Sequence, residues 1–299
     1  MRQSKLLTLL AIILLCAVLP AVSLAEGRWS SLWDSGCALL FRTDNVTVDG
    51  KASFALDGDR FKTANIHYVQ DGCCSLYDLK LLTPKADGTE RETGWTIIAD
   101  DDEDIYVMEV FYPGKYRVGS DGREATLLRR SVQLDAITDL GGLILKQLEP
   151  TLPADALTVS EAEGGQTIHI ALTADQIPDM AASALNLAAG YLSNRWFSYG
   201  RDRSVNEESY VSFENFATVT EALTYGTVRW ALRSLEADLT LDSQGRLTAV
   251  CGTLCAESTF VDKTVRLVEV DYDFTMTEYG TSYVRPFDPE EYGVGLFEY

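Results

Sequence analysis

The chain has 299 residues, of which 46% are hydrophobic and 23% are charged; this composition is typical of a globular protein and excludes a largely disordered one. Its 45 acidic residues outnumber its 25 basic residues and give a formal net charge of -20. Because such a chain repels phosphate groups, we expect no nucleic-acid binding. The two histidines, His67 and His169, have no second histidine or cysteine at ligand spacing, which disfavours a histidine-rich metal site and histidine-based catalysis.

The N-terminus has the order of a secretory signal. Two basic residues in 1–5 precede an apolar run over 6–22, and Ser23-Leu24-Ala25 follows it. This order predicts a signal peptide over residues 1–25, cleaved near Ala25, and a secreted or extracytoplasmic protein. The alternative is an uncleaved membrane anchor, since about 20 apolar residues are nearly long enough to span a bilayer.

The pattern then predicts an amphipathic helix over 29–42, followed by a series of short strands. Runs that alternate between apolar and polar residues occupy 45–49, 52–56, 61–68, 75–82, 94–99, 105–111 and 115–118. Turn dipeptides separate them: Asp49-Gly50, Asp57-Gly58, Asp71-Gly72, Asp87-Gly88 and Pro113-Gly114. Since Asp-Gly between alternating runs is a strong hairpin signal, we expect an antiparallel meander.

Helical spacing replaces the alternation in the middle of the chain. Apolar residues three and four apart predict helices over 127–148 and 174–197, with a hairpin over 157–161 and 166–172 between them and a short helix over 213–223 after them. Alternation returns in the long runs 227–241, 246–258 and 264–278. In the last run one face carries Val268, Val270, Tyr272, Phe274 and Met276, which indicates a sheet with one buried face.

Together these elements predict an α+β fold: a long curved antiparallel sheet, in the form of a half-open barrel, with helices packed on its concave face. We expect residues 26–299 to form a single domain with a helical insertion at 127–197. The alternative is two subdomains that divide near Ala125.

This order of elements resembles the lipoprotein-carrier superfamily, the LolA-like and LppX/LprG-like proteins with half-open barrels. The resemblance is carried by the last strand and its exit, Tyr272-Asp273-Phe274-Thr275-Met276-Thr277-Glu278-Tyr279-Gly280, which leads into Val284-Arg285-Pro286. The chain also looks like uncharacterised exported proteins of Gram-positive bacteria. It departs from the carriers in its insertion and in Leu15 before Cys16, where a lipobox has a small residue. No functional residue is carried over.

Five cysteines follow the signal segment: Cys37, Cys73, Cys74, Cys251 and Cys255. An odd number leaves at least one thiol unpaired. Cys251 and Cys255 lie four residues apart on one expected strand, roughly 13 Å, and this separation is too long for a disulfide. The disulfide state of the others stays open.

No motif indicates catalysis. The chain has no Gly-x-Ser-x-Gly and no phosphate-binding loop, and the acidic run 100–104 lacks the glycine and the closing glutamate of a calcium loop. His169 alternates with apolar residues, as a structural or exposed strand histidine does. We therefore expect no enzyme activity, no cofactor and no metal.

Aromatic residues make up 10% of the chain, and many fall on strand faces. They form either the ordinary core of a sheet or the lining of an apolar cavity between sheet and helices. The candidate lining residues are Phe54, Tyr68, Trp95, Tyr106, Leu185, Trp230, Tyr272 and Phe274. They predict an exported, non-enzymatic protein that binds a lipid or other apolar molecule. The alternative is a structural or protein-interaction component of the cell envelope with a filled core.

Overall fold

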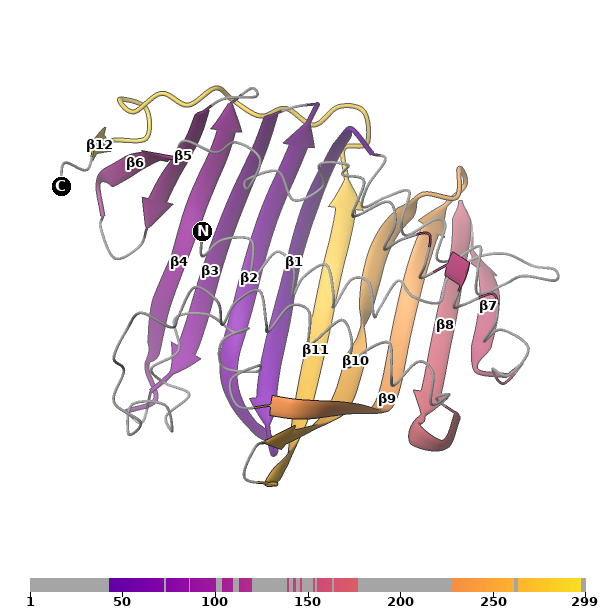
Figure 1. The fold of residues 1–299 in the computed structure, drawn as a ribbon. Helices are drawn as coiled ribbons and strands as arrows, with labels where there is room; N and C mark the ends of the chain where they lie inside the picture. Colours follow the sequence, from indigo (N-terminus) through magenta and orange to yellow (C-terminus); the bar gives the residue numbers. More distant parts are fainter. Residues whose placement is uncertain are drawn as a thin grey trace.

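The computed structural model describes residues 43–72, 74–85, 87–100, 104–109, 113–119, 139, 142–143, 146, 153, 155–162, 164–176, 227–260 and 263–296. Their strands form one twelve-stranded sheet in the order β12-β6-β5-β4-β3-β2-β1-β11-β10-β9-β8-β7 (Figure 1). The strands are β1 (Asn45–Leu56), β2 (Asp59–Asp71), β3 (Cys74–Pro84), β4 (Glu90–Asp100), β5 (Asp104–Glu109), β6 (Lys115–Gly119), β7 (Leu157–Ala162), β8 (Gly165–Thr173), β9 (Thr227–Asp242), β10 (Leu247–Phe260), β11 (Val265–Thr277) and β12 (Gly295–Leu296).

The first and last long strands of the chain meet in the middle of this sheet. β1 pairs with β11 in antiparallel register, from Thr47 opposite Thr277 to Leu56 opposite Val268. The meander β2 to β6 continues on one side of β1, and β10, β9, β8 and β7 continue on the other side of β11. All neighbouring pairs in the sheet are antiparallel except β12 with β6. Strands from both sides of Ala125 thus share one sheet.

Most of the expected hairpin turns are present. Asp57 and Gly58 join β1 to β2 with φ values of 53° and 88°, the left-handed pair that a two-residue hairpin requires. Gly72, Gly88 and Gly114 also have positive φ values, between β2 and β3, between β3 and β4, and before β6. The meander expected from the Asp-Gly spacing is confirmed at these positions.

The expected turn at Asp49-Gly50 is wrong, because both residues lie inside β1. Gly50 stands opposite Phe274 of β11, and a Cβ atom on Gly50 would lie 1.8 Å from Cδ1 of the Phe274 ring. The glycine therefore makes room for an aromatic ring from the neighbouring strand. Glycine is favoured both at a tight turn and where another group approaches the backbone closely, so the sequence does not distinguish the two cases.

The expectation of an α+β fold with helices packed on the concave face is also wrong. The described structure is an open, curved sheet that is nearly all strand, with no helix packed on its face. In the predicted insertion at 127–197, Leu157–Ala162 and Gly165–Thr173 join the sheet as the hairpin β7–β8, and Asp139, Gly142, Leu143 and Lys146 have helical backbone. The helical spacing in the middle of the chain predicts a second, helical layer. The period of two instead accounts for nearly all described elements.

The segment predicted as a helix over 174–197 begins with the 3-10 turn η3 (Ala174–Gln176). The Thr173 backbone N–H donates to Oε1 of Gln176 at 2.9 Å, as in a capping box. The rest of this segment, the helices predicted over 29–42 and 213–223, and the signal segment 1–25 lie outside the described residues. In the part of the chain that the structure describes, no helix has the length and apolar character of a membrane span.

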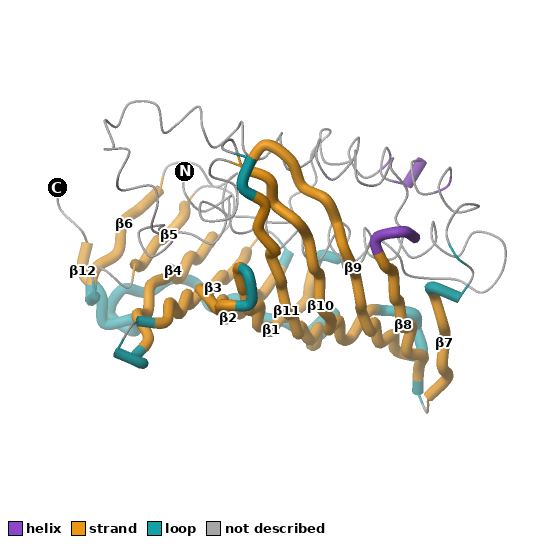
Figure 2. The backbone as a smooth tube through the Cα atoms, turned by 90° about the horizontal axis from the view of Figure 1, so that it is seen from below, coloured by secondary structure: helices purple, strands orange, loops and turns teal. Residues whose placement is uncertain are grey.

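The two faces of the sheet differ in chemistry. We call one the apolar face: its buried side chains form one cluster that extends from β7 across the sheet to β5. On β11 its members are Val268, Val270, Tyr272, Phe274 and Met276, each at most 4% exposed, as the alternation predicts. The opposite, outer face carries Glu269, Asp271 and Asp273 on the same strand. Figure 2 shows the curved sheet from below, and β9 and β10 bend strongly at one end.

A C-terminal segment, which we call the strap (residues 279–296), runs along one end of the strands and packs on the outer face of β2 to β5 there. It leaves β11 and runs past β1 to β6, where β12 pairs with Lys115 and Tyr116 (Figure 1). Its Val284, Phe287 and Tyr292 belong to a second apolar cluster with Val69 and Ile98. Because Val69 and Ile98 each follow a residue of the apolar face, they point to the opposite side.

The strap is anchored where it begins. The Asn45 side-chain amide donates to the Ser282 carbonyl oxygen at 2.8 Å and accepts the Ser282 N–H at 2.6 Å. It also donates to Oδ1 of Asp71 at 3.1 Å, and Oδ2 of Asp71 accepts the Val284 N–H at 3.2 Å. Asn45 opens an Asn-Val-Thr glycosylation pattern, but its amide nitrogen is used in these structural hydrogen bonds.

Candidate ligand-binding face

Four of the expected lining residues come together on the apolar face. Phe54 on β1, Tyr68 on β2, and Tyr272 and Phe274 on β11 are between 0% and 3% exposed and belong to one cluster. β1 and β11 are paired, and β2 lies directly beside β1. The centre of the sheet thus carries an aromatic surface.

Two of these rings lie close against the sheet, over glycines. Phe274 occupies the space beside Gly50, as described above, and Oη of Tyr272 is 2.7 Å from the position that a Cβ on Gly252 would take. The Tyr272 hydroxyl donates to the Glu236 carbonyl oxygen at 3.4 Å. These two side chains therefore lie directly against the backbone of the sheet on its apolar face.

Trp95 on β4 and Trp230 on β9 are partly buried and pack against the same cluster. They lie on opposite sides of the central pair β1–β11 in the strand order. They border the aromatic surface and do not belong to its buried centre.

Tyr106 is on the opposite face. Its neighbours Ile105 and Val107 belong to the apolar face, so alternation along β5 points Tyr106 outward. There its ring stacks on Phe287 of the strap, with centroids 4.1 Å apart and an interplanar angle of 20°. The sequence could not predict this partner, because the strap follows Tyr106 by more than 170 residues. Leu185 lies outside the described residues.

Sequence reasoning missed the polar groups on the apolar face. The Tyr68 hydroxyl donates to Oε1 of Gln70, and the Gln70 amide donates to the carbonyl oxygen of Gly72. Gln70 is itself 6% exposed. This chain of hydrogen bonds links the apolar face to the β2–β3 turn, so the hydroxyl of Tyr68 is satisfied. Burial raises the pKa of Tyr68, which keeps its hydroxyl protonated as a donor.

Tyr77 on β3 is different, although it stands directly opposite Tyr68 in the β2–β3 register. It is 2% exposed. Among the buried side-chain polar atoms of the described residues, its hydroxyl oxygen is the one without a hydrogen-bond partner. Burial, together with the negative charge of Asp78, raises the pKa of Tyr77. The alternating pattern places Tyr77 on a strand face but does not reveal its missing partner.

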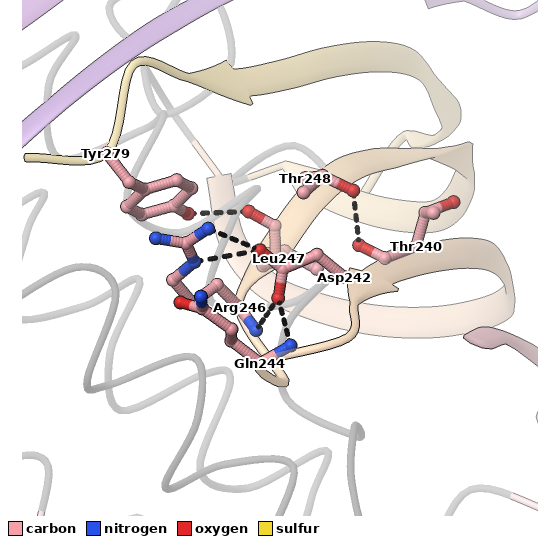
Figure 3. A network of polar contacts seen from close by, with 7 residues as sticks. All are labelled: Thr240, Asp242, Gln244, Arg246, Leu247, Thr248 and Tyr279. Atoms are coloured by element: carbon pink, nitrogen blue, oxygen red, sulfur yellow. Dashed lines mark hydrogen bonds and ion pairs between the residues drawn. The ribbon is translucent and has the colours of Figure 1, made fainter. Parts of the chain in front are cut away.

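A polar corner borders the apolar face at the turn between β9 and β10 (Figure 3). Oδ1 of Asp242 accepts the N–H groups of Gln244 and Arg246 at 2.8 and 2.9 Å, and its Oδ2 accepts from Nε of Arg246 at 2.8 Å. The Arg246 guanidinium lies 4.9 Å from the ring centroid of Tyr279, whose hydroxyl donates to the Leu247 carbonyl oxygen at 2.5 Å. The corner thus joins the exit of β11 to the β9–β10 turn.

Partial burial by itself raises the pKa of Asp242, but the hydrogen bonds from Arg246 and Gln244 and the charge of Arg246 outweigh burial and lower the pKa below its usual range. The carboxylate is therefore ionised in the folded protein at neutral pH. This arrangement ties a turn, and it has no features of a general acid, which needs a raised pKa.

The two histidines lie on the outer face, and each pairs with an aspartate on the neighbouring strand. Nδ1 of His67 lies 2.7 Å from Oδ1 of Asp49, and Nδ1 of His169 lies 2.9 Å from Oδ1 of Asp238. Both histidines are partly exposed. His169 was expected on a strand, and the structure places it on β8.

The exposed thiol of Cys251 lies in the same row as His169, but it is not activated. Cys251 stands opposite Asp238, and Asp238 stands between it and His169. Partial burial and the charges of Asp238 and Asp273 raise the pKa of the Cys251 thiol, which lowers the population of the nucleophilic thiolate.

Cys74, Cys251 and Cys255 are free thiols, and the last two lie on the single strand β10, as predicted. Cys37 and Cys73 lie outside the described residues. Within the described ranges, His, Cys, Asp and Glu side chains form no group of three or more that could hold a metal ion.

No protein-family model and no curated protein matches the chain. Among solved structures, the chain is similar to a LolA superfamily protein from Nitrosomonas europaea, with 12% identity, a TM-score of 0.23, and coverage of 90% of this chain and 98% of that chain. It is also similar to a DUF1329 family protein from Desulfovibrio piger, with 10% identity, a TM-score of 0.17, and coverage of 80% and 89%. The first bears the superfamily name that the order of elements suggested, and neither supports a Gram-positive origin. At these scores no residue role is transferred from either protein.

Proposed function

We propose that this chain is an exported, non-enzymatic protein that holds a lipid or another apolar molecule against the apolar face of its sheet. The observation that carries this proposal is the form of that face: one aromatic-rich cluster that extends over strands β7 to β5 of a single open sheet. An apolar sheet face is stable only against a second layer. The described strands form one such layer, and the proposal places an apolar ligand in contact with its aromatic side chains.

Export is the second part of the proposal, and it is supported by the basic, apolar and small-residue order of residues 1–25. Expression of the full chain in a bacterial host, followed by N-terminal sequencing of the protein recovered outside the cytoplasm, tests it. The expected N-terminus is Glu26. A chain that retains Met1 and stays in the membrane fraction would indicate an anchor.

A specific observation favours the alternative of an envelope component with a filled core. Phe274, Ile170, Leu239 and Val250 are all 0% exposed, as they are when side chains alone fill the space above a sheet. The two functions differ in one property, which is whether the face accepts a foreign apolar molecule.

The test is binding of 1,6-diphenyl-1,3,5-hexatriene, a hydrocarbon dye that fluoresces when it leaves water, together with native mass spectrometry of the purified protein. We expect saturable dye binding and a co-purified apolar molecule that organic solvent extracts. Absence of both would overturn ligand binding and leave the filled-core alternative.

Two matched variants locate the dye. Ala64 on β2 is buried on the apolar face, whereas Ala55 on β1 faces the outer side. Ala64→Leu is expected to reduce dye binding, because the larger side chain takes space on the apolar face, and Ala55→Leu is expected to leave it unchanged. Equal effects of the two substitutions would place the dye elsewhere and contradict the proposed site.

A further inference from the structure

The unpaired hydroxyl of Tyr77 requires a physical explanation. A buried hydroxyl without a partner loses its hydrogen bonds to water and gains none in return. Phenylalanine at this position would fill the same volume without that penalty. The neighbouring Tyr68 shows that the same face can satisfy a tyrosine, because Gln70 accepts its hydroxyl hydrogen.

The surroundings of Tyr77 define what could pair with it. In the sheet register it stands between Tyr68 on β2 and Ile97 on β4, and Leu79 follows it on the same face of β3. Its pKa is raised by burial and by Asp78, so the hydroxyl is a neutral donor. The hydroxyl hydrogen therefore needs an acceptor atom within an apolar environment.

We propose that the Tyr77 hydroxyl determines ligand specificity, and that the ligand is an apolar molecule with an uncharged acceptor oxygen, such as the carbonyl of an ester or a ketone. The hydroxyl donates to this oxygen, while the hydrocarbon part lies on the aromatic surface. This inference rests on the proposed function, since it requires a ligand on the apolar face.

Charge argues against an anionic headgroup at this position. On this face of β2, β3 and β4, the nearest basic residues are Lys62 and Arg91. Lys62 is six residues from Tyr68 along β2, and Arg91 is six residues from Ile97 along β4. Six residues of strand correspond to about 20 Å. A carboxylate or phosphate at Tyr77 would have no cation near it on these three described strands, and burying an unpaired charge costs far more than burying a neutral carbonyl.

Displacement of 1,6-diphenyl-1,3,5-hexatriene by methyl laurate and by tetradecane tests the inference, because only methyl laurate has a carbonyl. Tyr77→Phe should weaken methyl laurate binding about threefold to tenfold, the range of one net hydrogen bond, and leave tetradecane binding unchanged. The ligand-free Tyr77→Phe protein should have an unchanged or higher Tm, since it loses an unsatisfied group. Tyr283→Phe is the control: it removes the same atom from a side chain that is 69% exposed on the strap, and both affinities should stay the same.

The outcomes separate this inference from the proposed function. If the dye binds but Tyr77→Phe changes methyl laurate and tetradecane equally, the role of Tyr77 is refuted and the proposed function stands. If the wild-type protein neither binds the dye nor co-purifies with an apolar molecule, both fail. A variant-independent measurement is the infrared carbonyl band of isotope-labelled methyl laurate bound to the wild-type protein. A shift to lower frequency, as for a hydrogen-bonded ester, supports the inference, and the frequency seen in a hydrocarbon solvent overturns it.

Discussion

Replacement of Gly50 by alanine tests the packing at the centre of the sheet. In most strands this change is neutral or stabilises by roughly 0.5–1 kcal/mol, because glycine loses more backbone entropy on folding. At Gly50 the new Cβ would lie 1.8 Å from Cδ1 and 2.4 Å from Cε1 of Phe274. Since non-bonded carbon atoms do not approach this closely, the Phe274 ring must move.

The cost follows from where the ring can go. Phe274 is 0% exposed and is surrounded by the apolar cluster. Overpacking a core of this kind costs about 1–3 kcal/mol, and partial exposure of the ring adds part of the roughly 1.5–3 kcal/mol that its burial contributes. We therefore expect Gly50→Ala to lower the free energy of unfolding by about 2–4 kcal/mol.

Urea unfolding of a double-mutant cycle measures this effect. In a Phe274→Ala background the ring is absent, so Gly50→Ala should become neutral or slightly stabilising, with a coupling of about 2–4 kcal/mol. Gly295→Ala is the control, because its nearest contact would be Nζ of Lys115 at 3.7 Å. An equal loss from Gly50→Ala with and without Phe274 would refute the explanation and point to backbone strain at Gly50.

Three other substitutions test the strap and the polar corner. Asn45→Ala removes three hydrogen bonds to Asp71 and Ser282 and should lower the free energy of unfolding by about 1–3 kcal/mol. Amide hydrogen exchange should become faster in 282–296 while β11 stays protected. Unchanged exchange in the strap would contradict the anchoring role. Phe287→Ala removes the stack on Tyr106 and should cost about 2 kcal/mol in urea unfolding, because the ring is only half-buried; a loss as large for Phe287→Leu would argue against ring stacking. The folded-state pKa of Asp242 lies below its ordinary value of 3.8, so its stabilisation is complete above that value and is lost as the pH falls through the folded pKa. Asp242→Asn should therefore flatten the decrease of Tm on acidification below pH about 4, and the same slope in both proteins would exclude Asp242 as its source.

Alternation along the chain predicted most of the strands and which side chains share a face within each of them. The residues of β11 show this most clearly, because each apolar position from Val268 to Met276 is buried. Turn positions at Asp57-Gly58 and Asp71-Gly72 were equally clear, since positive φ is a local requirement. The aromatic surface at Phe54, Tyr68, Tyr272 and Phe274 followed from the same period of two.

Partners distant in sequence were decided only by tertiary structure. The signature Asp49-Gly50 is compatible with a turn, and Phe274 from the far end of the chain makes it part of a strand. Alternation separates Tyr106 from its neighbours on β5 but does not reveal its partner. The strap supplies that partner, because Phe287 stacks on the Tyr106 ring. Whether a buried hydroxyl finds an acceptor depends on the side chains that the register brings beside it: Tyr68 has Gln70, whereas Tyr77, directly opposite, has none among the described residues. Local patterns determine which side chains become buried, but the identity of their neighbours is set by strand pairing over more than 200 residues of intervening chain.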